Sequence, residues 1–202
     1  MITISIRSQF PKLAEELKRL PDEVANPALA RALNRTIEQG RTQMARSISR
    51  EYNLTYGQVR DRLRMEMAVA KRGNIKLSAT LDARDRYGTN LIHFVERSVT
   101  LAESRRRKES GTFGHVGFKI RRGSGMKFIT GPRAIFIGNN GRTVFRRTGK
   151  KRLPIEPVTT IDVPAMFNQQ TINATVRGVM LEKFEPIFER EVDFYLNRWA
   201  AR

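Results

Sequence analysis

Residues 26–52, NPALARALNRTIEQGRTQMARSISREY, decide the fold of the N-terminal part of the chain. Apolar and small residues recur in this stretch at three- and four-residue spacing, which is typical of a helix with one buried face. Asn26 followed by Pro27 is a typical helix start, because proline is tolerated at the first helical position. We therefore predict a helix of about 25 residues whose buried stripe consists of Leu29, Leu33, Ile37, Gly40, Met44, Ile48 and Tyr52.

Two shorter helices flank this one. Phe10, Leu13 and Leu17 repeat at helical spacing and predict a helix from Pro11 to Arg19, which Pro21 ends. After the long helix, Thr55 and Gln58 have the spacing of a capping box, and Val59 and Leu63 follow on one face. The N-terminal part, residues 1–63, is therefore expected to be helical.

The pattern changes to period two from about residue 64, which indicates strands. The clearest pair of strands flanks Gly138-Asn139-Asn140-Gly141, because Asn-Gly supplies the positive φ angles that a tight hairpin requires. A further extended segment, residues 154–163, contains prolines that exclude a central place in a sheet but permit an edge. The other predicted strand regions are 75–81, 91–95, 116–120, 134–137 and 143–145.

Helical spacing returns from Met166 to Trp199, and Pro186 is expected to kink or split this helix. The order of helices, strands and a final helix favours an α+β fold over a doubly wound sheet. We predict one domain over residues 1–202, with N-terminal helices (1–63), a central antiparallel sheet or small β-barrel (64–163) and a long C-terminal helix kinked near Pro186 (164–202). A chain of 202 residues is long enough for one such core.

The net charge of +18 is concentrated in the middle of the chain. Residues 104–152 carry 15 basic and 1 acidic side chains, whereas residues 153–202 carry 5 and 7. This excess favours a surface that meets phosphate without sequence specificity, and solvated loops are the alternative. The candidate contacts with DNA or a protein partner are Arg105, Arg106, Arg107, Lys108, Lys119, Arg121, Arg122, Arg146, Arg147, Lys150, Lys151 and Arg152.

Aromatic residues interleave with these clusters. At strand spacing they favour core positions, and stacking on nucleic-acid bases is the alternative. They are Phe113, Phe118, Phe128 and Phe145.

No motif indicates catalysis, a metal or a cofactor. The chain contains no cysteine, and its two histidines, His93 and His115, have no metal-binding spacing. The acidic residues of the last helix, Glu182, Glu185, Glu189 and Asp193, are expected on an exposed face paired with Lys183 and Arg190. Because no nucleophile elbow and no ligand cluster occur, we expect no enzyme. A nuclease or other DNA-processing enzyme is a third alternative, for which His93, Glu96 and Glu103 are the best candidates. No apolar stretch long enough to cross a membrane and no signal peptide are recognisable.

Two stretches resemble the prophage minor tail protein Z family of lambda-like phages. The first is Ala28 to Arg62, ALARALNRTIEQGRTQMARSISREYNLTYGQVRDR, with its Ala-Leu-Asn-Arg start and Met-Ala-Arg centre. The second is Arg133 to Phe167, in which two strands flank Asn140-Gly141-Arg142 and are followed by Gly149-Lys150, Leu153-Pro154-Ile155 and Val163-Pro164 in the family's order. Residues 65–132 match by basic character alone.

The resemblance implies a structural minor tail or tail-completion protein at the head-proximal end of a phage tail. Its implied partners are the tail terminator, the tail tube and further copies of itself in a ring such as a hexamer, with non-specific contact to DNA and none to a membrane. It would be made in the bacterial cytoplasm and end in the virion. The alternative is a sequence-independent nucleic-acid-binding protein that acts without a ring.

Overall fold

The computed structural model describes residues 1–4, 10–71, 74–85, 88–97, 116–129, 135–149 and 151–201. The chain divides into two compact units. Unit 1 consists of Met1–Ser47, Tyr56–Arg84 and Pro164–Arg202, and unit 2 consists of Ile48–Thr55 and Asp85–Val163. The α+β class is confirmed, and the single domain expected from the sequence stays a prediction.

The helix predicted from residues 26–52 is present as α3, Asp22–Glu51. It begins one turn earlier than predicted, because the carbonyl of Pro21 accepts the backbone N–H groups of Val24 and Ala25, each at 2.9 Å. Asp22 and Glu23 in the first turn also favour this start, since carboxylates interact well with the positive end of the helix dipole. Pro27 therefore lies inside α3 and not at its first position.

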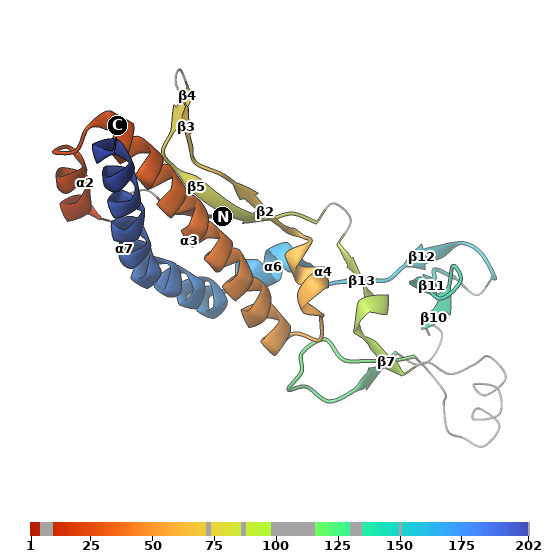
Figure 1. Cartoon of the computed structure of the whole chain (residues 1–202). Coiled ribbons are helices and arrows are strands. Elements are labelled where there is room, and N and C mark those ends of the chain that lie inside the picture. The colour runs from red at the N-terminus through yellow and green to blue at the C-terminus, as the bar shows by residue number, and fades with distance from the viewer. Residues whose placement is uncertain are drawn as a thin grey trace. The chain divides into compact units, whose positions relative to one another are not determined.

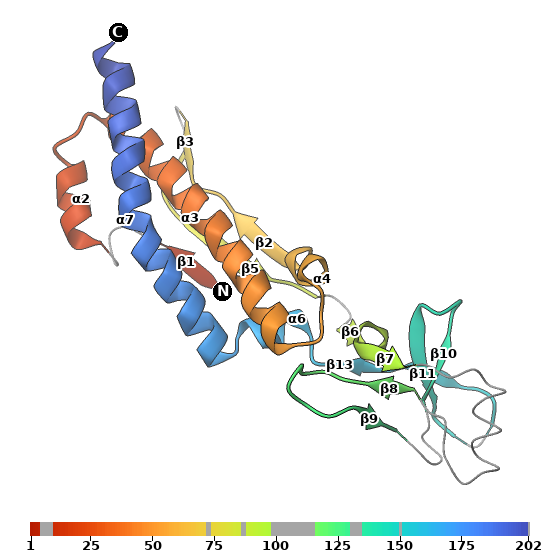
Figure 2. The same cartoon turned by 60° about the horizontal axis from the view of Figure 1, so that its bottom comes forward.

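The C-terminal helix α7, Gln170–Ala200, follows the short helix α6, Val163–Phe167. It runs through Pro186 without a break, so the predicted possibility of a split helix is wrong. Figures 1 and 2 show α7 lying alongside α3 with the opposite chain direction. The two helices are in close contact where Gly40 faces Met180, because a Cβ atom on Gly40 would lie 2.4 Å from the Met180 sulfur.

The two short helices of the N-terminal part are also present. Helix α2 spans Pro11–Leu17 and α4 spans Tyr56–Arg60. The ring of Phe10, just before α2, stacks on Phe184 of α7 with 4.5 Å between centroids. This contact fixes the start of α2 to the long helix.

A three-stranded sheet of order β1-β5-β2 lies along α3 in both views (Figures 1 and 2). Its strands are β1, Ile2–Ile4, β5, Ala79–Ala83, and β2, Leu63–Glu66. Strands β3, Val69–Lys71, and β4, Asn74–Lys76, form a separate two-stranded ladder. The predicted strand 75–81 is thus divided between β4 and β5.

An irregularity causes this division. Between the pairs Glu66↔Thr80 and Val69↔Lys76, one strand has two residues and the other has three. Asn34 of α3 binds the chain at this point, because its amide donates to the Ala68 carbonyl at 3.0 Å and accepts from the Ala68 N–H at 2.7 Å. The α3 side chain therefore takes the place of a neighbouring strand at Ala68.

The first half of unit 2 contains β6, Thr89–Asn90, the 3₁₀ helix η1, Leu91–Phe94, and the sheet β7-β8-β9. The strands of this sheet are β7, Val95–Arg97, β8, Gly117–Phe118, and β9, Lys127–Phe128. The strand predicted over residues 91–95 is wrong, because Asn90 caps η1 by accepting the Ile92 N–H at 3.0 Å. The strand predicted within 116–120 is confirmed as β8.

The predicted hairpin is confirmed as β10, Ile135–Gly138, and β11, Thr143–Arg147. Asn139, Asn140 and Gly141 have φ angles of 53°, 52° and 83°, as the sequence of the turn requires. Strand β12, Ile155–Pro157, pairs with β11 at the edge of the sheet, and β13, Thr159–Thr160, pairs with β6. In the described residues the β structure is thus spread over several small antiparallel sheets, where the sequence predicted one central sheet or barrel.

Candidate nucleic-acid interface

Seven of the twelve predicted contact residues lie in described parts of unit 2. They fall into two groups, one just after β8 and one along β11 and the segment that follows it. Arg105, Arg106, Arg107, Lys108 and Lys150 lie outside the described residues. The seven are Lys119, Arg121, Arg122, Arg146, Arg147, Lys151 and Arg152.

The first group is held against the end of α3. Tyr52 and Arg121 form an isolated antiparallel bridge. The N–H of Asn53 donates to the Ile120 carbonyl at 2.8 Å, and the N–H of Arg122 donates to the Glu51 carbonyl at 2.9 Å. The segment 120–122 is therefore fixed in backbone position, and its arginine side chains start from a defined place.

The two guanidinium groups of this turn lie close to Tyr52. Arg121 lies over the Tyr52 ring, 5.6 Å from its centroid, and its Nη2 is 3.6 Å from Oε1 of Glu51. Arg122 Nε donates to the Tyr52 carbonyl at 3.4 Å. Lys119 is anchored through its backbone N–H, which donates to the Phe94 carbonyl at 2.9 Å.

An open hollow of about 420 Å³ lies beside these arginines. Its lining adds Arg50, from the last turn of α3, to Glu51, Arg121, Gly123 and Ser124. Ser124 closes the turn, because its hydroxyl donates to the Arg121 carbonyl at 2.8 Å. The sequence did not point to Arg50, because the apolar spacing of its helix indicated a packing role. The position of Arg50 in the last turn of this helix was the available signal.

The second group lies on the sheet β10-β11-β12. Arg147 lies over the Phe136 ring at 4.8 Å, and Phe136 is the cross-strand partner of Phe145, with 6.1 Å between ring centroids. Arg146 points to the other face, as alternation along a strand requires. It pairs there with Glu156 at 3.3 Å. The Phe145 face therefore carries two aromatic rings and one guanidinium group.

Asn90 links this sheet to η1. Its Oδ1 accepts the Val144 N–H at 3.0 Å as well as the Ile92 N–H, and its amide donates to the Val144 carbonyl at 3.5 Å. The N–H of Leu91 donates to the Val158 carbonyl at 2.9 Å. One asparagine side chain thus positions the strand that carries Arg146 and Arg147.

The acidic side chains in the described part of unit 2 all have partners. Glu51 faces Arg121, Glu156 faces Arg146 and Glu96 accepts from Asn53 at 3.0 Å. Asp85 accepts from the Thr89 hydroxyl at 3.0 Å, and Asp162 also takes part in an interaction. The larger number of Lys and Arg side chains in this part of the chain is therefore not neutralised locally.

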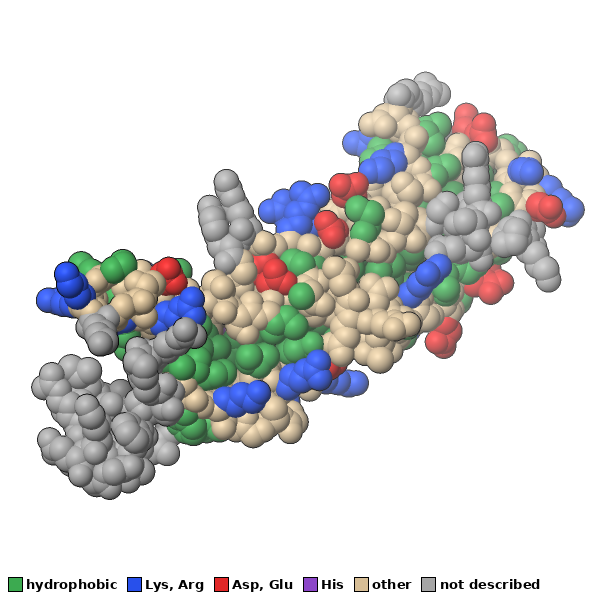
Figure 3. All heavy atoms as spheres, turned by 180° about the vertical axis from the view of Figure 1, so that it is seen from behind, with side chains coloured by type: hydrophobic (Ala, Val, Ile, Leu, Met, Phe, Trp, Pro, Cys, Tyr) green, Lys and Arg blue, Asp and Glu red, His purple; other side chains and the backbone are tan. Residues whose placement is uncertain are grey.

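The phenylalanines that interleave with the basic residues divide between core and surface. Phe118 is buried, Phe145 is half-buried, and Phe128 is 47% exposed. Phe113 lies outside the described residues. Phe128 covers Gly117, where a Cβ atom would lie 2.9 Å from its ring. The core interpretation is thus correct for Phe118, and Phe128 is available for contact. Figure 3 shows Lys and Arg side chains next to exposed hydrophobic ones on one face of the molecule.

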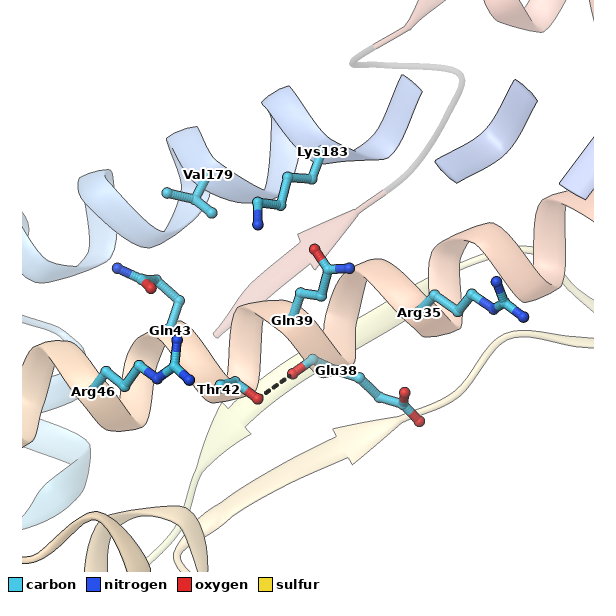
Figure 4. Close-up of a pocket in the computed structure, with 8 residues that line it drawn as sticks. All are labelled: Arg35, Glu38, Gln39, Thr42, Gln43, Arg46, Val179 and Lys183. Carbon is cyan, nitrogen blue, oxygen red and sulfur yellow. Dashed lines mark hydrogen bonds between the residues drawn. The ribbon is translucent and has the colours of Figure 1, made fainter. Parts of the chain in front are cut away.

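In unit 1, a polar groove of about 360 Å³ lies between α3 and α7 (Figure 4). Gln39, Gln43 and Lys183 point toward one another across it, whereas the carboxylate of Glu38 points away. The Thr42 hydroxyl donates to the Glu38 carbonyl at 3.1 Å, so its hydrogen bond lies within α3. This lining has the composition of a solvated groove between two helices.

The residues considered for a nuclease are only partly placed. Glu96 is exposed and accepts from Asn53, His93 lies in η1, and Glu103 is outside the described residues. No group of three His, Cys, Asp or Glu side chains that could hold a metal occurs among the residues that the structure describes. No helix within the described ranges is long and apolar enough to cross a membrane.

The sequence model of prophage minor tail protein Z matches residues 12–202. The chain belongs to this family. No curated protein and no solved structure matches it. The matched range includes both long helices and all of unit 2, so the basic surface lies within the family region. Membership makes the chain a structural tail protein and a component of the phage particle.

Proposed function

We propose that the protein is a tail-completion component at the head-proximal end of the tail, where unit 2 faces the path of the DNA. The observation that carries the proposal is the basic surface of unit 2, whose described carboxylates are all engaged. Arg50 and Arg121 line an open hollow in this surface. Contacts of this kind neutralise phosphates and read no sequence. Such contacts are compatible with DNA that has to move.

The proposed partners are the tail terminator, the tail tube and further copies of the chain in a ring, such as a hexamer. A closed ring around the tail axis would bring several copies of the basic surface to one path. The chain would be made in the host cytoplasm and incorporated into the tail.

The test is complementation of a phage that lacks this protein. The variant carries Arg50→Gln, Arg121→Gln, Arg122→Gln and Arg147→Gln, and the control carries Arg19→Gln, Arg64→Gln, Arg177→Gln and Arg190→Gln, four exposed positions of unit 1. We expect complete particles in both cases and a titre reduced about tenfold or more with the unit 2 variant alone.

Two results would contradict the proposal. Normal titre with the unit 2 variant would remove the role of the basic surface. Tight DNA binding by a lone monomer that never enters particles would favour the free-standing nucleic-acid-binding protein instead.

A further inference from the structure

The ladder β3-β4 leaves an apolar side chain uncovered. We define the hairpin tip as the described residues 67–71 and 74–78. Within it, Ile75 is 60% exposed and Met67 is 37% exposed. Ile75 continues the alternation of Ala79 and Leu81, both of which are fully buried. Ile75 therefore fits the sequence pattern of a buried strand residue but is exposed to solvent.

A two-stranded ladder is marginally stable in water by itself. The cross-strand neighbour of Ile75 is Ala70, whose small side chain covers little of it. A second molecule that covered the exposed side chains of Ile75 and Met67 would remove apolar surface from water, which is favourable. The hairpin tip is thus suited to form an interface with another molecule.

The hairpin tip is basic. Its described residues contain two lysines, Lys71 and Lys76, and no acidic residue. Lys71 and Lys76 are both exposed, and Lys76 is 3.1 Å from Glu66 at the base of the hairpin. A partner that covers Ile75 must therefore accept positive charge.

The exposed face of α7 has the complementary charge. Glu182, Glu185, Glu189 and Asp193 recur at helical spacing, are all exposed, and form the acidic stripe. The predicted pairing with Lys183 and Arg190 is wrong, because none of these six side chains forms an ion pair within the described residues. Both charged surfaces lie in unit 1, and α3 runs between the hairpin and α7 in Figures 1 and 2.

We propose that the hairpin tip of one copy packs on the acidic stripe of α7 in a second copy. Lys71 and Lys76 would face the carboxylates, and Ile75 would lose its contact with water. Each copy can thus bind one neighbour through its hairpin tip and another through its acidic stripe. Such head-to-tail contacts can close a ring. The inference rests on the self-association in the proposed function, for which it names the interface.

Cross-linking provides the test, since the chain contains no cysteine. The variant Ile75→Cys with Glu189→Cys is treated with mild oxidant or a short bis-maleimide. We expect dimers and larger species on a denaturing gel. The control pairs Ile75→Cys with Ala174→Cys, on the same side of α7 but about 22 Å away along the helix, at about 1.5 Å per residue. This control should remain monomeric.

Charge exchange provides the second arm. Lys71→Glu with Lys76→Glu, or Glu185→Lys with Glu189→Lys, should weaken self-association about tenfold or more, because like charges then face each other. The combination of all four changes should restore it. Sedimentation over a range of concentrations measures the effect.

Equal cross-linking in variant and control, or a chain that stays monomeric and uncross-linked, overturns the interface. The arginine variants of unit 2 should cross-link through Ile75 and Glu189 as the parent does. Failure of the DNA surface and failure of the interface are therefore distinguishable.

Discussion

Single side chains connect elements that the backbone alone would leave apart. Asn34 and Asn90 each present an amide that both donates to and accepts from one backbone residue, Ala68 and Val144 respectively. An amide side chain can replace a strand neighbour in this way because it has the same donor and acceptor groups as a peptide. Sequence periodicity marks neither asparagine, since such a role depends on the tertiary partner.

Glu191 joins the two long helices and leads to the first prediction. Its side chain is 3% exposed and faces Arg31 Nε at 3.3 Å and Arg35 Nη1 at 2.6 Å. The pKa of Arg31 is raised, first by its side-chain hydrogen bond with Tyr195 and then by the charge of Glu191. Arg31→Ala with Arg35→Ala should destabilise the fold by about 3–5 kcal/mol, because a buried carboxylate would lose its partners.

Glu191→Gln should cost less, about 1–3 kcal/mol, since both arginines are partly exposed and can be hydrated. Urea unfolding measures both free energies. Glu189→Gln, two residues away but exposed and without an ion pair in the described residues, is the control and should stay within about 0.5 kcal/mol of the parent. Equal costs for all three variants would show that Glu191 is not a link between the helices.

Gly40 determines how closely the two long elements approach. A Cβ atom there would lie 2.4 Å from Sδ and 2.9 Å from Cγ of Met180, which is buried. We predict that Gly40→Val destabilises the protein by about 1–3 kcal/mol, because the added atoms overpack the contact. Thermal or urea unfolding provides the measurement.

The control is Gly178→Ala in α7, where a Cβ atom meets nothing within 4 Å. It should stabilise the protein by about 0.5–1 kcal/mol, since alanine loses less backbone entropy than glycine in a helix. Combining Gly40→Val with Met180→Ala should cost less than the sum of the two separate changes, because the truncated side chain makes room. If the two free-energy costs are additive, the destabilisation by Gly40→Val does not come from its contact with Met180.

The elements that sequence predicted well have strong local signals. The periodicity of α3 and α7 and the Asn-Gly turn between β10 and β11 act within a few residues. Prediction was wrong where a distant partner decided the structure. Residues 91–94 form η1, because Asn90 caps it while hydrogen-bonding to the distant Val144. Residues 75–81 are interrupted where the ladder changes register beside Ala68, which Asn34 of α3 binds. For the candidate interface, composition located the cluster of basic residues. It could not identify Arg50, because Arg50 lines the hollow only together with the turn at Gly123.

For the whole molecule, the distribution of charge matters more than its sum. Residues 104–152 have a net charge of +14 and residues 153–202 of −2. The basic surface of unit 2 and the acidic stripe of α7 can therefore act on different partners, DNA and a second copy. Salt weakens both contacts, but counterion release makes the DNA contact the more sensitive of the two.

This difference leads to the last prediction, on DNA affinity as a function of salt. The plot of log affinity against log salt should lose about 0.9 in slope for each phosphate contact removed. The unit 2 variant with Arg50, Arg121, Arg122 and Arg147 changed to Gln should show this loss, whereas the unit 1 control should keep the slope of the parent. Two duplexes of equal length and unrelated sequence should bind equally, because phosphate contacts carry no sequence information. A strong preference for one duplex, or an unchanged slope in the unit 2 variant, would contradict the proposed role of this surface.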